Sequence, residues 1–134
     1  MASLSTIEGI GPDYAAKLNA AGCNSVEELL EMGGTAKGRA ALAASSGASE
    51  KLILGWVNRA DLMRVKGIGE QYSDLLEEAG VDTVAELAQR NAANLTKAMA
   101  DVNEKRNLVK ALPTEDAVEG WIAHAKTLPK AVSH

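Results

Sequence analysis

The feature that most constrains this chain is a stretch that it contains twice. GIGPDYAAKLNAAG runs from Gly9 to Gly22, and GIGEQYSDLLEEAG runs from Gly67 to Gly80, 58 residues later. In each copy two glycines flank one isoleucine, and a tight turn between helices needs glycines where a side chain would block the backbone. Because the same local structure should form twice, the sequence predicts two related units.

A helix is expected after each glycine turn, ended by a glycine in the left-handed conformation at Gly22 and Gly80. The next helix of each copy opens with a capping box, formed by Ser25 with Glu28 and by Thr83 with Glu86. Four further residues are predicted to be N-caps of helices: Ser3, Asp61, Ser49 and Thr114. Ser3 and Asp61 are each expected to open a short helix that precedes the turn.

The second halves of the copies share the stretches GWVNRA and GWIAHA, which place Trp56 and Trp121 in equivalent positions. Both tryptophans are interpreted as core anchors, with stacking on a ligand as the alternative. Cys23 follows a glycine cap and is interpreted as a small core residue, with a reactive thiol as the alternative.

Alanine is abundant, phenylalanine is absent, and no alternating strand pattern occurs, so we expect an all-α fold. The predicted organisation is a tandem of two compact units, residues 3–60 and 61–128, followed by a frayed tail at 129–134. Since no Gly-, Ser- or Pro-rich linker separates the units, they are expected to pack as one body with pseudo-symmetry.

The stretches TIEGIGPDYAAKLNAAG and RVKGIGEQYSDLLEEAG resemble the helix-hairpin-helix motif. The complete units are similar to the N-terminal helix-hairpin-helix domains of recombinases and to the C-terminal helix-hairpin-helix domain of the α chain of bacterial RNA polymerase. As a tandem, residues 3–128 resemble a family of uncharacterised bacterial proteins. The resemblance implies that hairpin amides could bind DNA phosphates, and that hairpin carbonyls could hold a monovalent cation. The contact residues it implies are Gly9, Ile10, Gly11, Gly67, Ile68 and Gly69, helped by the bases Lys17 and Lys66.

The charge pattern argues against a simple transfer of DNA binding. Residues 7–29 carry one base and four acids, and residues 65–87 carry one base and six acids, which gives net charges of −3 and −5. Asp13 and Glu70 fall in the first turn of the hairpin helices, where a carboxylate takes the electrostatic place of a phosphate. The basic residues gather instead in the second halves of the units, where they form either a DNA-binding face or ordinary solvated helix surfaces, and we favour the latter: Lys37, Arg39, Lys51, Arg59, Arg64, Lys97, Lys105, Arg106 and Lys110.

No catalytic set is predicted, because the chain has two histidines and one cysteine without a partner pattern for nucleophilic or metal chemistry. We therefore expect no enzyme activity, no metal, no cofactor and no small-molecule substrate. The absence of a long apolar run or a secretory signal favours a cytoplasmic protein that does not contact a membrane. A non-catalytic module that binds a protein partner or another copy of itself is slightly favoured, and sequence-nonspecific binding of double-stranded DNA is the alternative.

Overall fold

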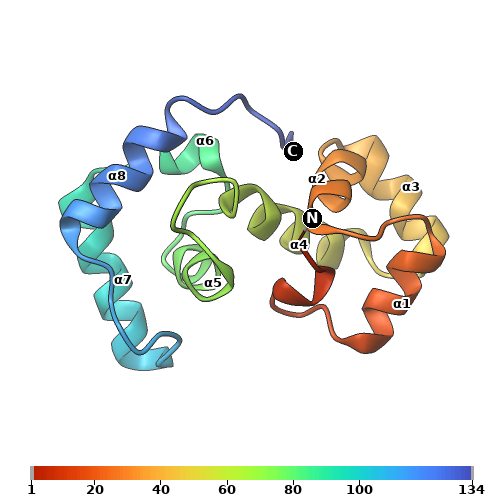
Figure 1. Cartoon of the computed structure of the whole chain (residues 1–134), viewed down its shortest axis with the longest axis horizontal. Coiled ribbons are helices and arrows are strands. Elements are labelled where there is room, and N and C mark those ends of the chain that lie inside the picture. Colours follow the sequence, from red (N-terminus) through yellow and green to blue (C-terminus); the bar gives the residue numbers. More distant parts are fainter. Residues whose placement is uncertain (1, 134) are drawn as a thin grey trace. The chain divides into compact units, whose positions relative to one another are not determined.

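The fold is known from a computed structural model that describes residues 2–133. Within that range the chain contains eight α-helices, one short 3-10 helix and no β-strand (Figure 1). The all-α prediction is therefore confirmed. None of the helices in this range is both long enough and apolar enough to cross a membrane.

The chain divides into two compact units between Asp61 and Leu62, and residues 131–133 return to the first unit. The first unit contains the 3-10 helix η1 (Leu4–Thr6) and the helices α1 (Pro12–Ala20), α2 (Val26–Gly33) and α3 (Ala36–Ser46), together with all but the last residue of α4 (Glu50–Leu62). Its core is built from fully or almost fully buried side chains, among them Ile7, Leu18, Leu29, Ile53 and Trp56.

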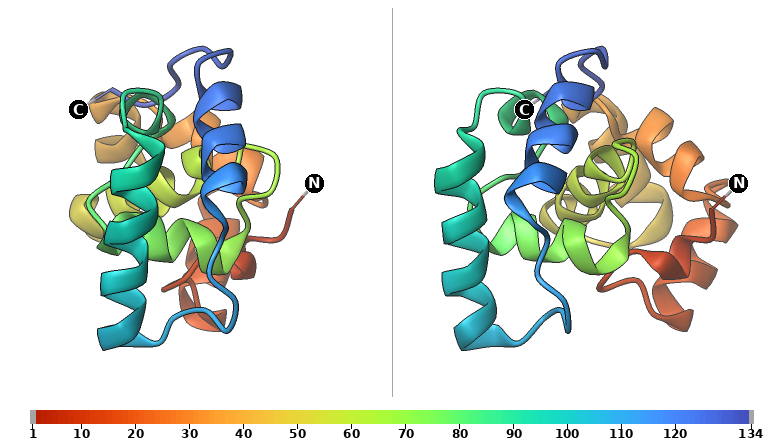
Figure 2. Two further views of the ribbon diagram at one scale, coloured as in Figure 1. Left: turned by 90° about the vertical axis from the view of Figure 1, so that its left-hand side faces the viewer. Right: turned by 60° about the vertical axis from the view of Figure 1, so that its left-hand side comes forward.

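The second unit contains α5 (Glu70–Glu78), α6 (Val84–Leu87), α7 (Ala92–Arg106) and α8 (Glu115–Ala125). The long helix α7 packs against both α8 and α5, and the two views of Figure 2 show α7 and α8 running side by side. Trp121 belongs to the core of this unit together with Leu75, Leu76 and Met99. Because Trp56 and Trp121 are only 2% and 6% exposed, their interpretation as core anchors is confirmed.

Most of the residues that the sequence predicts to cap helices do so in the structure. Ser25 and Thr83 accept bonds from the backbone amides of Glu28 and Glu86, and Thr114 caps α8 in the same way. Gly22 and Gly80 have φ angles of +90° and +95°. After them, the amides of Cys23 and Val81 each donate to a carbonyl five residues back, at 2.9 Å, which is the hydrogen bond that closes a Schellman motif.

Two local expectations are corrected by the structure. Asp61 does not open a new helix, because α4 continues through it to Leu62, and the Asp61 side chain is 2% exposed. Residues 131–133 are not frayed, since Val132 is 2% exposed and the Ser133 amide donates to the Gly34 carbonyl at 2.8 Å. The sequence of this segment has no periodic pattern, so its docking could not be anticipated.

Candidate functional site

Each unit contains a turn with nearly identical backbone geometry, which we call turn 1 (residues 7–11) and turn 2 (residues 65–69). The Ile10 amide donates to the Ile7 carbonyl, and the Ile68 amide donates to the Val65 carbonyl, both at 3.1 Å. The third residue of each hydrogen-bonded turn is a glycine, Gly9 or Gly67, with φ of +94° or +97°. This is the pattern of a type II β-turn, which requires a positive φ at that position.

A tryptophan packs directly against each of these glycines. A Cβ atom on Gly9 would lie 3.1 Å from Nε1 of Trp56, and one on Gly67 would lie 2.9 Å from Nε1 of Trp121. Each tryptophan also contacts a tyrosine of the helix that follows the turn, with ring centroids 5.0 Å apart for Tyr14 and 5.2 Å apart for Tyr72. The first glycine of each pair is therefore required by the fold.

The second glycine of each pair has no such structural reason. Gly11 and Gly69 have φ angles of −85° and −103°, an extended backbone that any residue adopts. A Cβ atom at either position would meet no heavy atom within 4 Å. These glycines leave open space directly in front of the helices α1 and α5.

The same two positions are the N-caps of α1 and α5, and neither helix start receives a hydrogen bond from a capping side chain. By contrast, α2, α3, α6, α7 and α8 are all capped by a Ser, Thr or Asn side chain. The first backbone amides of a helix have no partner within the helix, and together with the helix dipole they attract an anion. Turns 1 and 2 thus present amide donors next to open space.

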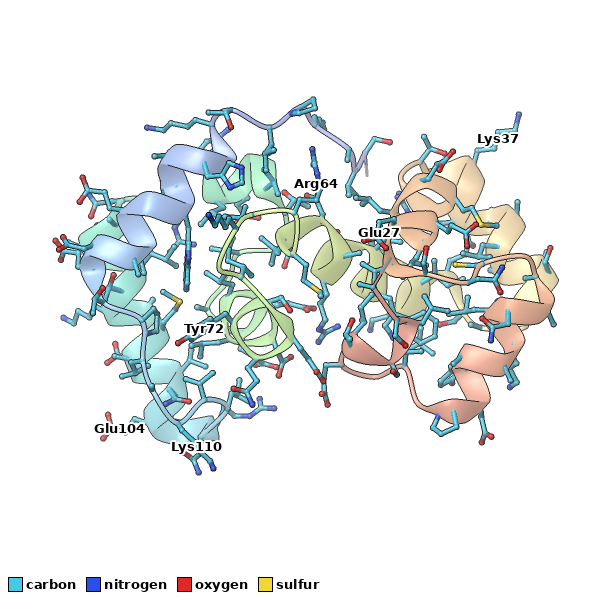
Figure 3. All side chains as sticks on the ribbon, viewed as in Figure 1. Glu27, Lys37, Arg64, Tyr72, Glu104 and Lys110 are labelled. Atoms are coloured by element: carbon cyan, nitrogen blue, oxygen red, sulfur yellow. The ribbon has the colours of Figure 1, made fainter. Side chains whose placement is uncertain are left out.

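A depression of about 550 Å³ lies at the start of α5, and its lining joins turn 2 to the loop between α7 and α8. It is lined by Gly67, Gly69, Glu70, Gln71, Tyr72, Lys110 and Ala111. The Tyr72 hydroxyl donates to the Ala111 carbonyl at 3.0 Å, which fixes the loop to α5. Figure 3 shows Tyr72 on α5 and Lys110 on the α7–α8 loop. The lining holds one carboxylate, Glu70, and one ammonium group, Lys110, so its formal side-chain charge is zero. The partial positive charge at the start of α5 is then the remaining attraction for an anion.

The predicted contact residues occupy different environments. The side chains of Ile10 and Ile68 are 4% exposed, so these residues plug the core, while the four turn glycines are exposed. Lys17 extends over the ring of Tyr14, with Nζ 5.3 Å from the centroid. The backbone amide of Lys66 donates to Nδ1 of His124 at 3.1 Å.

Neither predicted base lines the depression, and the lysine that does so is Lys110. The sequence favoured a solvated helix surface for Lys110, and its proximity to turn 2, about 40 positions earlier, follows only from the fold. The sequence signal was the group of bases that includes Lys97, Lys105, Arg106 and Lys110.

Three carboxylates of the two acidic segments have hydrogen-bond partners in their own unit. Glu28 and Glu86 accept from the amides of Asn24 and Asp82, and Glu78 pairs with Arg106 at 3.1 Å. Of the acids in the two segments, Asp13 and Glu70 are those in the first turns of α1 and α5. The amide bonds leave Glu28 and Glu86 charged, whereas the charge of Glu78 is paired with that of Arg106, so both segments stay acidic around the open helix starts.

Cys23 shows none of the features of a reactive thiol. Its side chain is fully buried, and this desolvation, with a smaller contribution from Glu28, raises the pKa of the thiol to about 11. A thiol with this pKa is almost entirely protonated at neutral pH, and the protonated form is a poor nucleophile. The interpretation of Cys23 as a core residue agrees with this environment.

Comparison with known proteins identifies the family of the chain. The family described as a domain of unknown function (DUF4332) matches residues 8–128. The chain therefore belongs to the DUF4332 family. No solved structure matches it. Across residues 2–133, no group of three or more His, Cys, Asp or Glu side chains is placed to hold a metal ion.

Proposed function

We propose that the chain is a non-catalytic tandem helix-hairpin-helix binding module, in which turns 1 and 2 are the hairpins. The paired turn hydrogen bonds, the positive φ of Gly9 and Gly67 and the buried Ile10 support this assignment of the motif. Its role is protein interaction, in which turn 2 receives an anionic group of a protein partner.

The observation that carries this proposal is the depression at the start of α5. It combines uncapped backbone amides with Lys110, and Leu112, which is 45% exposed, follows in the same loop. A single carboxylate can be satisfied by a few amide donors and one ammonium group. We therefore expect a partner that presents a carboxylate to the α5 amides and Lys110, and an apolar side chain to Leu112.

The proposal is tested by selecting peptides from a random library on the full chain and measuring their affinity for variants. Gly69→Asp places a carboxylate in front of the amides, and Lys110→Ala removes the ammonium group. We expect both variants to lose the selected acidic peptides, while Gly11→Asp, the matched change in turn 1, retains them. Peptides that bind all three variants equally would show that turn 2 is not the site.

A second candidate function is sequence-nonspecific binding of double-stranded DNA. The specific observation in its favour is that both α1 and α5 begin with an uncapped, open glycine, since each of these helix starts could contact a phosphate. Against it, Asp13 and Glu70 repel a polyanion and each turn lacks a nearby cluster of bases.

The DNA alternative has its own measurement. Fluorescence anisotropy of a labelled random duplex at low salt should show no binding at tens of micromolar protein, roughly the range expected for nonspecific binders. Binding that is lost in the Gly11→Asp/Gly69→Asp double variant would establish DNA binding through the hairpins and would replace the protein-interaction proposal.

A further inference from the structure

The first unit binds a segment of its own chain where α2 ends and α3 begins, at a surface formed by Gly34 and Arg39 that we call the groove. Residues 131–133 lie there, more than ninety positions from the residues that they contact. Val132 is 2% exposed and is the only one of the three residues that is buried. The contact therefore consists of one apolar anchor and a short set of main-chain bonds.

The groove is built for a peptide backbone. The Ser133 amide donates to the Gly34 carbonyl at 2.8 Å, and the Ser133 carbonyl accepts from Nη2 of Arg39 at 2.6 Å. A Cβ atom on Gly34 would lie 2.5 Å from the Ala131 carbonyl oxygen, so glycine is required for the segment to approach. Main-chain bonds combined with a few buried side chains are a usual way to bind an extended peptide.

Arg39 is a buried cation in this groove, not a solvated helix residue as the sequence suggested. It is 5% exposed and donates from Nη1 to the Gly33 carbonyl at 2.9 Å, at the end of α2, which has no basic residue in its own last turn. The second guanidinium bond goes to the docked segment. Since a buried polar group that loses its partner is costly, the groove favours an occupant at all times.

We propose that the 131–133 segment of a second copy can take the place of the chain's own segment in this groove, so that two copies are linked by reciprocal exchange. The exchange keeps the bonds of Ser133 to Gly34 and Arg39, because each groove is filled by an identical segment. An unrelated peptide would instead leave the displaced Val132 in water and would have to compete with a tethered segment. A second copy is therefore the partner that the groove fits.

Two complementary variants test the proposal in the full chain. Val132→Asp damages the segment and leaves the groove intact, while Gly34→Val damages the groove and leaves the segment intact. Each variant alone should remain at the 14.0 kDa mass of one chain in sedimentation equilibrium. In an equimolar mixture the intact groove of Val132→Asp can receive the intact segment of Gly34→Val. At roughly millimolar concentration the measured mass should therefore shift toward about twice that of one chain.

The controls separate exchange from other contacts. Circular dichroism and thermal melting establish that each variant is folded, and Arg39→Met, which removes both guanidinium bonds, replaces Gly34→Val if that variant is not. The peptide PKAVS should dissociate the mixed dimer, and a scrambled peptide should not. A mixture that stays monomeric, or a dimer that PKAVS leaves intact, would overturn the proposal. PKAVS binding to Val132→Asp without any mixed dimer would show that the groove holds its segment only within one chain.

Discussion

The indole of Trp121 occupies the space in which a side chain on Gly67 would have to lie. A Cβ atom there would be 2.9 Å from Nε1, and Gly67 has a φ of +97°. Gly69, two residues later, has an extended backbone and open space around it. The two glycines of turn 2 therefore serve different purposes, one in the fold and one at the proposed binding surface.

Alanine substitutions should separate these purposes. We expect Gly67→Ala to lower the free energy of unfolding by about 2 kcal/mol or more, because a positive φ strains the residue and the indole must move. Gly69→Ala should change it by less than about 0.5 kcal/mol. Urea unfolding followed by circular dichroism measures both values, and equal losses would contradict the distinction.

A carboxylate at the start of α5 should stabilise the fold while it removes binding. Gly69→Asp provides a side-chain cap where none exists, and its charge interacts favourably with the helix dipole. We expect a gain of about 0.5 kcal/mol in unfolding free energy. The variant should nevertheless lose the acidic peptides selected on the wild type. A variant that is more stable and still binds them would argue that the α5 amides are not involved.

The hydroxyl of Tyr72 should control the loop that carries Lys110. Because it donates to the Ala111 carbonyl, Tyr72→Phe should cost about 1 kcal/mol and increase amide hydrogen exchange in residues 110–112. Tyr14→Phe is the matched control, since Tyr14 packs on Trp56 in the same way in the first unit. Similar exchange in wild type and Tyr72→Phe would show that the loop is fixed by other contacts.

The buried thiol of Cys23 predicts a loss of stability at alkaline pH. Its pKa rises from 9.0 to about 11 on folding, so above pH 9 the unfolded chain releases a proton that the folded chain retains. The protonated thiol therefore contributes its full share to the free energy of unfolding below pH 9. Between pH 9 and 11 the free energy of unfolding should fall by about 2–3 kcal/mol. The difference in unfolding free energy between wild type and Cys23→Ala, measured from pH 7 to 11, isolates this group. A difference that does not change with pH would contradict the assignment.

Local sequence rules predicted the parts of the structure that depend on neighbouring residues. Capping by Ser25, Thr83 and Thr114 needs only a hydroxyl three residues before an amide, so spacing is sufficient to predict it. The left-handed Gly22 and Gly80 follow from the same kind of local rule. The pattern also showed that glycines flank a buried isoleucine, but it could not distinguish the glycine that the fold requires from the one that it does not.

Contacts between distant parts of the chain were beyond local rules. The bond from Tyr72 to Ala111 joins residues 39 apart, and the bond from Arg39 to Ser133 joins residues 94 apart. No periodicity marks Lys110 as a wall of the depression or Val132 as a buried anchor. Asp61 was predicted to be an N-cap because of its residue type, but the continuation of α4 through it depends on packing around a buried side chain.

The open amides at the start of α5 are proposed to bind an anionic group. The most direct measurement is a titration of the ¹⁵N-labelled full chain with an acetylated Glu-Leu-Asp peptide amide, followed by NMR. We predict saturable shifts of the Gly69, Glu70 and Gln71 amides, with no shift at the Thr83-capped start of α6. Absent shifts, or equal shifts at the two helix starts, would contradict the claim.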